Sequence, residues 1–158
     1  MEEVVIAIDP GAKGATAVRF ATGGVVVYEF ESEIDQKNYI AEVVRAARED
    51  NYNVRAIVEH VDGFMGNAAP GNAMFNFGKN YGIHLGILMT LEVPTELVRP
   101  SVWQKGLPKT PKLASKAAAK AQHKRDLKDY AARLFPYVKV TLANADALLL
   151  LNYTLKNK

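Results

Sequence analysis

Three acidic residues stand where apolar runs begin or end, and their placement suggests chemistry. Asp9 closes the run "VVIAID", Glu59 closes "AIVE", and Asp146 opens "DALLLLNY". An ionised carboxylate at such a position loses hydration, so it needs a cation, a network of donors or a chemical role. If the fold brings these residues together, three converging carboxylates repel one another until cations bind between them.

The acids predict a site for hard divalent cations. Carboxylate oxygens, without cysteine or a histidine pair, select Mg²⁺ or Mn²⁺ rather than zinc. Two such ions about 4 Å apart activate a water and stabilise the leaving oxygen in phosphodiester hydrolysis. We expect two ions in the site, with Asp9 bridging both and with Glu59 and Asp146 holding one each.

Each acid taken alone also has a structural interpretation. Asp9 would cap the turn through Pro10 and Gly11, and Glu59 would pair with a lysine. Asp146 would serve the N-terminal end of its helix.

The apolar periodicity supplies the elements that must position these acids. The expected strands are residues 3–9, 14–20, 23–32, 54–61 and 95–104, of which the first three form an antiparallel meander. The expected helices are residues 37–50, 74–91 and 125–135, with a final helix from about residue 144. This order predicts an α/β fold, a mixed five-stranded sheet flanked by helices.

Length and composition are typical of one intracellular domain. The chain has 158 residues, of which 49% are hydrophobic, and no cysteine. We expect a single domain over residues 1–158, in a reducing compartment such as the cytoplasm. The apolar stretches are interrupted too often to span a bilayer, so no membrane association is expected.

Positive charge is concentrated in one segment, residues 105–128, which we call the basic segment. It holds eight basic residues against one acid, whereas the whole chain has a net charge of only +3. Such asymmetry favours a polyanionic partner, although a solvated helix face is the alternative. The segment is expected to be an insert that holds nucleic acid.

Five blocks of sequence carry a family resemblance. They are "AIDPGAKGATAV", "IVEHVDGFMG", "FNFGKNYGIHLGIL", "VRPSVWQKGL" and "ADALLLLNY". Together, and in this order, they resemble the RuvC-type Holliday junction resolvases, particularly the phage-encoded branch. The resemblance implies an RNase H-like fold, a homodimer, dependence on divalent metal, and paired nicking of four-way DNA junctions that leaves 5′-phosphate and 3′-hydroxyl ends. It would place the protein in the host cytoplasm, and Asp9, Glu59 and Asp146 fall on the family's acidic positions.

One position departs from the family pattern. RuvC-like proteins commonly carry a further acid or histidine three residues before the aspartate of "DAL", and here that residue is Ala143. Three alternatives stay open. Asn144 would supply a neutral oxygen, Asp62 would reach in from its loop, or the chain would be a variant with weakened chemistry.

Basic and aromatic residues are the expected contacts to DNA. Lys105 is expected to neutralise charge on the cleaved phosphate, and Phe64 is expected to stack as an exposed wedge on bases opened at a junction. The other expected DNA-binding residues are Lys13, Lys79, Lys109, Lys112, Lys116, Lys120, Lys124 and Arg125.

Other aromatic residues have structural interpretations. Phe75 and Phe77 are expected in the core, as is Trp103, which would close the last strand. His60 alternates to the strand face opposite Glu59, so we interpret it as structural.

Two other function classes are compatible with parts of the pattern. An actin-like kinase or ATPase also begins with an acid and glycines after its first strand, but it needs two such domains, so no nucleotide cofactor is expected. A non-catalytic protein that binds junctions on the same fold is the second alternative, and Ala143 favours it.

Overall fold

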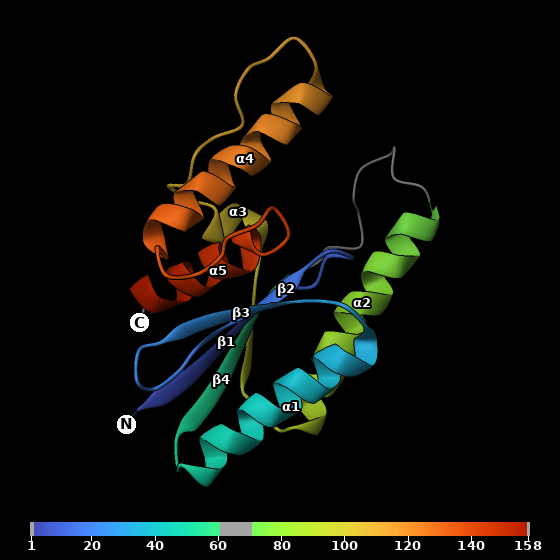
Figure 1. Cartoon of the computed structure of the whole chain (residues 1–158). Helices are drawn as coiled ribbons and strands as arrows, with labels where there is room; N and C mark the ends of the chain where they lie inside the picture. The colour runs from blue at the N-terminus through green and yellow to red at the C-terminus, as the bar shows by residue number, and fades with distance from the viewer. Residues whose placement is uncertain (1, 61–70, 158) are drawn as a thin grey trace.

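A five-stranded sheet organises the chain. The computed structural model describes residues 2–60 and 71–157. Its strands are β1 (Glu3–Asp9), β2 (Ala15–Arg19), β3 (Val25–Glu29), β4 (Asn53–Glu59) and β5 (Thr95–Val98). They lie in the order β3-β2-β1-β4-β5 (Figure 1). The first three form an antiparallel meander, β4 runs parallel to β1, and β5 runs parallel to β4. The predicted α/β fold with a mixed five-stranded sheet is confirmed.

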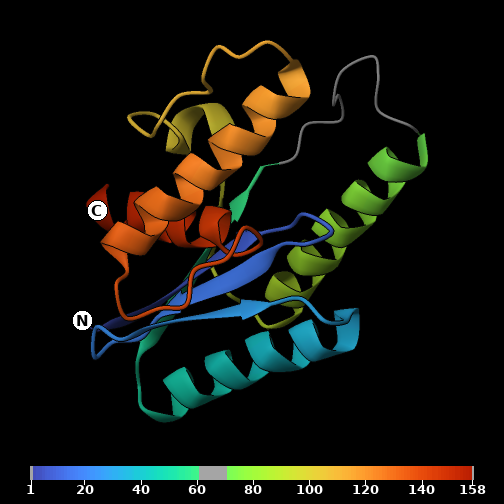
Figure 2. The same ribbon diagram turned by 45° about the horizontal axis from the view of Figure 1, so that its top comes forward.

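Helices cover both faces of this sheet. The helices α1 (Glu33–Glu49) and α2 (Gly71–Thr90) lie on one face, and α3 (Pro100–Trp103), α4 (Lys116–Leu134) and α5 (Ala145–Lys156) lie on the other (Figures 1 and 2). Side chains alternate along β1, so Ile6 and Ile8 pack toward α1 and α2, whereas Val5 and Ala7 pack toward α5. Asp9 continues the second series and therefore faces the α5 layer.

The first two helices begin slightly earlier than predicted. Ser32 caps α1, because its Oγ accepts a hydrogen bond of 3.1 Å from the Asp35 backbone N–H, and the helix therefore begins at Glu33 rather than at residue 37. The predicted helix 74–91 corresponds to α2, which begins at Gly71 and ends at Thr90.

The predicted strand 95–104 is wrong in its second half. The strand β5 ends at Val98, and Pro100 opens the short helix α3, which ends at Trp103. Proline favours the first turn of a helix, because its φ angle already suits the helix and it lacks only an N–H that would have no helical partner there. Trp103 is nevertheless buried, with 2% of its surface exposed, so its predicted place in the core is confirmed.

The helix predicted at 125–135 begins nine residues earlier. The Oγ of Ser115 accepts a hydrogen bond of 3.1 Å from the Ala118 backbone N–H, and α4 runs from Lys116. The alanine-rich run after Ser115 has high helix propensity, and lysine is nearly as favourable. The second half of the basic segment is therefore helical, whereas residues 108–115, which contain two prolines, are not.

No helix in the described ranges is long and apolar enough to cross a membrane.

Candidate active site

The fold brings the three predicted acids to one place. Asp9 ends β1 and Glu59 ends β4, and these strands pair in parallel with Ile8 opposite Val58, so the two acids follow side by side. Ile57 packs in the same core cluster as Val5, so Glu59, two residues later, faces the α5 layer as Asp9 does. Asp146 lies in the first turn of α5.

A tight turn fixes Asp9. The backbone N–H of Gly11 donates a hydrogen bond of 3.0 Å to Oδ1 of Asp9, so the structural interpretation of Asp9 as a turn cap is correct as far as it goes. At Gly14, a Cβ atom would stand 2.0 Å from the backbone oxygen of Asp9, so only glycine fits there. The turn occupies one carboxylate oxygen of Asp9 and leaves the other available.

Glu59 is held by the indole of Trp103. The Nε1–H of this buried tryptophan donates a hydrogen bond of 2.8 Å to Oε2 of Glu59. The sequence pattern predicts Trp103 as a core residue and gives no sign of this contact, because α3 and β4 are joined only by the tertiary fold. Glu59 therefore has a tryptophan as its hydrogen-bond partner, and among the described residues it forms no ion pair with a lysine, the alternative interpretation of this acid.

Burial and mutual repulsion shift the acids toward their protonated forms. Burial, followed by the charge of Asp146, raises the pKa of Asp9 to about 6. Burial, followed by the charge of Asp9, raises the pKa of Glu59 to about 7. Burial also raises the pKa of Asp146. The three carboxylates lie within electrostatic reach of one another, as the sequence predicts, and near neutral pH the site favours a proton or a cation.

The donor set suits a divalent cation, although the side chains are not gathered around one. No three acidic, histidine or cysteine side chains of the described ranges lie close enough together to form a ready metal site. The three acids nevertheless offer only oxygen ligands, and within those ranges none of them forms an ion pair. Hard oxygen donors with unrelieved repulsion fit Mg²⁺ or Mn²⁺, and binding would require the carboxylates to draw closer.

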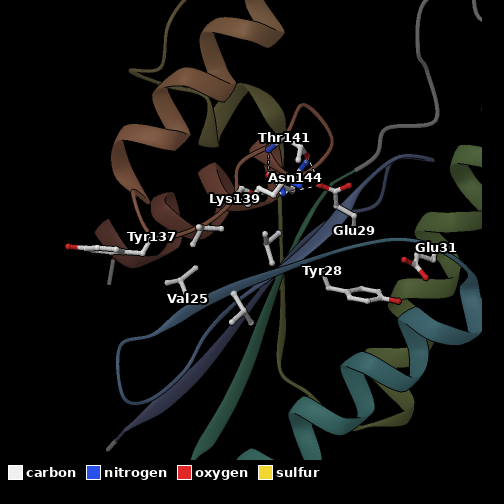
Figure 3. Close-up of a pocket in the computed structure, with 11 residues that line it drawn as sticks. Val25, Tyr28, Glu29, Glu31, Tyr137, Lys139, Thr141 and Asn144 are labelled. Atoms are coloured by element: carbon white, nitrogen blue, oxygen red, sulfur yellow. Dashed lines mark hydrogen bonds between the residues drawn. The ribbon is translucent and has the colours of Figure 1, made fainter.

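The Asn144 amide is engaged in structural hydrogen bonds. Its Oδ1 accepts a hydrogen bond of 2.9 Å from the Thr141 backbone N–H. Its Nδ2 donates to Glu29 at 3.0 Å and to the Lys139 carbonyl at 3.1 Å. Asn144 is 2% exposed and precedes α5 as its N-cap residue, tying the 139–144 segment to β3 (Figure 3). These contacts disfavour the hypothesis that Asn144 supplies a metal oxygen, and Asp62 lies outside the described residues.

A pocket lies beside this tie and not at the acids. It has a volume of about 530 Å³ and lies between the edge strand β3 and the segment that contains Tyr137, Lys139 and Thr141 (Figure 3). Asp9, Glu59 and Asp146 do not line it. The acidic site is therefore recognised by its charges and its position in the fold rather than by a cavity.

The predicted DNA-binding residues are spread over several elements. Lys13 is exposed in the turn after β1, Lys105 is exposed in the turn after α3, and Lys79 on α2 forms an ion pair of 2.6 Å with Glu33. Phe64 lies outside the described residues. The remaining predicted residues are exposed on α4 or in the segment before it: Lys109, Lys112, Lys116, Lys120, Lys124 and Arg125.

Two aromatic predictions have different outcomes. Phe75 is 72% exposed on α2, so its predicted place in the core is wrong, whereas Phe77 is half-buried. His60 faces away from the acids, and its Nδ1 lies 3.1 Å from the Tyr81 hydroxyl on α2. The structural interpretation of His60 agrees with this contact.

Two residues on α4 act on the acids without being predicted to do so. Lys124 lowers the pKa of all three carboxylates, and His123 lowers that of Asp146. A helical repeat through Ala119, His123 and Leu127 places His123 on the buried side of α4. The predicted helix begins only at residue 125, so Ala119 and His123 lie outside it and the repeat is not recognised from the sequence.

Comparisons with known proteins agree on the architecture. No protein-family model matches the chain, and no curated protein sequence matches it. A structure of Thermus thermophilus RuvC in complex with a Holliday junction substrate is 17% identical, covers 94% of this chain and 89% of its own, and has a TM-score of 0.51. The chain has the RuvC-type, RNase H-like fold. A second T. thermophilus RuvC structure, also 17% identical, covers 93% of this chain and 90% of its own with a TM-score of 0.50.

Proposed function

We propose that this chain is a metal-dependent, structure-selective DNA endonuclease of the RuvC type, of the phage-encoded branch, that resolves four-way junctions by paired phosphodiester hydrolysis. The observation that carries the proposal is the acidic site: Asp9, Glu59 and Asp146 lie within electrostatic reach of one another on a RuvC-type fold. Burial raises the pKa of each, and repulsion from a neighbouring acid adds to the shift of Asp9 and Glu59. The likeness to a RuvC bound to a junction substrate supports the choice of DNA.

The chain's own residues have distinct roles in this proposal. Asp9, Glu59 and Asp146 would hold the divalent ions, Mg²⁺ or Mn²⁺, and Asp9 would serve both ion sites. When bound, such ions supply an activated water and charge stabilisation at the leaving oxygen. The turn at Gly11 and the indole of Trp103 keep two of the carboxylates in place.

In this proposal, basic residues bind the DNA backbone. Those of the basic segment and Lys13 and Lys79 bind phosphates of the junction arms, and Lys105 neutralises charge on the cleaved phosphate. Phe64 stacks on an opened base. Two copies of the chain form a homodimer whose two sites make the paired nicks, in the cytoplasm and without a nucleotide cofactor.

A non-catalytic junction-binding protein is the second candidate. Two observations favour it: Ala143 offers no metal ligand, and the amide of Asn144 is hydrogen-bonded to Thr141, Lys139 and Glu29. Such a protein would bind branched DNA and leave it intact in any metal.

The test compares two DNA substrates of the same sequence. The purified chain is incubated with a synthetic four-way junction and with a linear duplex, in Mg²⁺, in Mn²⁺ and in excess chelator. We expect symmetric nicks that a ligase can reseal in the junction, an intact duplex, and no cutting with chelator. Equal cutting of the duplex would contradict structure selectivity, and tight junction binding without cutting in either metal would favour the second candidate.

A further inference from the structure

One carboxylate oxygen ties the segment before α5 to the edge of the sheet. Oε1 of Glu29, the last residue of β3, accepts a hydrogen bond from the Thr141 hydroxyl and another, of 3.0 Å, from Nδ2 of Asn144 (Figure 3). Both donors belong to residues 135–144, which join α4 to α5 and form neither helix nor strand. Asn144 is nevertheless only 2% exposed. Glu29 therefore anchors an irregular segment at a buried amide.

Thr141 and Asn144 also bond to each other in the pattern of a capping box. The Thr141 backbone N–H donates to Oδ1 of Asn144 at 2.9 Å, and the Asn144 backbone N–H donates to Oγ1 of Thr141 at 3.2 Å. Such reciprocal bonds are typical of the first turn of a helix. The Ala145 N–H donates to the Thr141 carbonyl at 3.2 Å and continues this turn into α5. Because the same oxygen of Glu29 bonds both members of the pair, Glu29 fixes the start of α5.

The register of the sheet relates this anchor to the acidic site. Asp9 on β1 pairs with Ala15 on β2, and Ala15 pairs with Glu29 on β3. Residues that pair directly point to the same face of a sheet, so Glu29 and Asp9 both face the α5 layer, about 10 Å apart at two strand spacings. The anchor of α5 and the first acid of the site thus lie in one row across the sheet.

The rotation of α5 on this row decides where Asp146 points. The start of α5 packs on the row, because Ala145 is buried in the same core cluster as Ala15. Successive helical residues are turned by about 100°, so residues two apart point to nearly opposite sides of a helix. Asn144 has a φ of −104° and a ψ of −7°, close to helical values. With Asn144 directed to Glu29, Asp146 is directed away from β3 and toward β1.

We infer that Glu29 is a positioning residue of the acidic site: by holding Thr141 and Asn144 it fixes the first turn of α5, and with it the direction of the Asp146 carboxylate. Glu29 itself contacts neither substrate nor metal. The inference rests on the proposed function and adds to it a fourth acid, which acts only through hydrogen bonds. Because Ala143 offers no ligand, the ions depend on three carboxylates, and a misdirected Asp146 would remove one of them.

Four variants separate this tie from effects of charge and of stability. Glu29→Ala removes the tie, whereas Glu29→Gln loses the charge and keeps an oxygen that accepts both hydrogen bonds. Glu31→Ala removes an exposed acid that lies two residues away and lines the same pocket. Ser32→Ala removes the cap of α1, on the opposite face of the sheet, and lowers stability without touching α5. Thermal unfolding of each variant verifies the fold.

The first measurement is calorimetric titration with Mn²⁺ in the absence of DNA. Glu29→Ala should weaken Mn²⁺ binding about 10-fold, as is typical when a residue that orients a metal ligand is removed. Glu29→Gln should restore most of the affinity, and Glu31→Ala and Ser32→Ala should bind Mn²⁺ like the wild type. With saturating junction and subsaturating Mn²⁺, the cleavage rates should follow the same order, while the affinity of Glu29→Ala for the junction is unchanged.

The second measurement requires neither metal nor cleavage. Amide hydrogen exchange in chelator reports how often the first turn of α5 opens, through the N–H of Ala145. This N–H should exchange roughly 10-fold faster in Glu29→Ala than in Ser32→Ala, the effect of losing a hydrogen bond to a charged group. The N–H groups in the middle of α5 should exchange at similar rates in the two variants.

The outcomes distinguish this inference from the proposed function. A wild type that neither binds Mn²⁺ nor cuts the junction would contradict the nuclease, and faster exchange at Ala145 in Glu29→Ala would still identify Glu29 as the residue that holds the turn of Asp146. Wild-type Mn²⁺ affinity in Glu29→Ala, or an equal loss in Ser32→Ala, would overturn the inference and leave the nuclease intact. Unchanged exchange at Ala145 would also overturn it, as would a Glu29→Gln variant that binds Mn²⁺ as weakly as Glu29→Ala.

Discussion

At the scale of single residues, the acidic site is held under electrostatic strain that a cation would relieve. Asp9 and Glu59 each carry a pKa raised well above that of a solvated carboxyl, and in each case burial contributes most. The Gly11 N–H and the Trp103 indole lower these pKa values only in part. The protein therefore has lower stability when these groups are ionised and no cation is bound.

This strain predicts how stability depends on pH. Between its unfolded value near 4.5 and its folded value of about 7, Glu59 binds more protons in the folded state, so stability falls as pH rises through this range. Glu59→Gln removes the charge and keeps an acceptor for Trp103. Without metal at pH 8 it should stabilise the protein by up to about 3 kcal/mol and raise Tm by up to roughly 6–12 °C. Near pH 4 the difference should vanish.

Calorimetry across this pH range, in chelator, measures the effect. Glu96→Gln, an exposed glutamate on β5, serves as the matched control and should leave Tm unchanged at both pH values. A Tm for Glu59→Gln equal to that of the wild type at pH 8 would mean that Glu59 is not strained.

The acids could be predicted from the sequence, but the residues that support them could not. An acid at the end of a buried strand is visible locally, and two such strands in one sheet place Asp9 and Glu59 together. By contrast, Asn144 reaches Glu29 across the fold, and Trp103 reaches Glu59 from a separate helix. Such contacts between distant segments leave no mark on local periodicity, so the sequence alone leaves Asn144 as a candidate ligand.

At the scale of elements, the basic segment divides into two structures. Residues 108–115 form neither helix nor strand, and from Lys116 the lysines follow α4. The predicted start of α4 is nine residues too late. Lysines at a spacing of four residues fit the exposed face of a helix, but they also fit an irregular segment rich in charge, so the pattern does not decide between the two. A mixed five-stranded sheet, in contrast, could be predicted, since the apolar runs of the first four strands are bounded by clear turn signals.

The basic segment should set the salt dependence of DNA binding. Replacing Lys109, Lys112 and Lys116 with alanine should weaken the binding of all junction sequences alike. The log-log slope against salt should flatten by about 0.9 for each phosphate that the variant no longer neutralises. Cleavage should fall at low DNA concentration and recover with DNA in excess, because the acidic site is untouched.

Titrations over a range of salt concentrations measure this slope. A matched variant that replaces Arg133, Lys139 and Lys156, which are exposed and lie outside the basic segment, should keep the wild-type slope. An unchanged slope in the Lys109, Lys112 and Lys116 variant would assign these lysines to a solvated face and direct attention to Lys13 and Lys79.

At the scale of the whole molecule, α2 leaves an apolar surface uncovered. Phe75 is 72% exposed and Met89 is 76% exposed. A groove of about 500 Å³ is lined mainly by Ile83, Ile87 and Leu91, with Ala41 of α1 on its other side, and Met89 lines a second hollow with Leu85. Exposed apolar surface on this scale is typical of an interaction site.

We expect this surface of α2 to join two copies of the chain. Sedimentation at micromolar concentration should show a dimer, and Met89→Glu should dissociate it because a charge would be buried in the interface. Ile34→Glu on α1, at a side chain that is 69% exposed, should leave the dimer intact. A wild-type monomer that does not shift when junction DNA is added would contradict the homodimer.

The most direct test of the account is the Asp9→Asn variant, which changes one charge in the acidic site and keeps the turn to Gly11. Its cleavage of a four-way junction in Mg²⁺ and its affinity for the same junction are measured beside the wild type, with Asp129→Asn, an exposed acid on α4, as control. We predict no detectable cleavage by Asp9→Asn, with junction affinity equal or higher because repulsion toward phosphate is reduced. Cleavage by Asp9→Asn at close to the wild-type rate would contradict the account and make Asp9 a turn residue only.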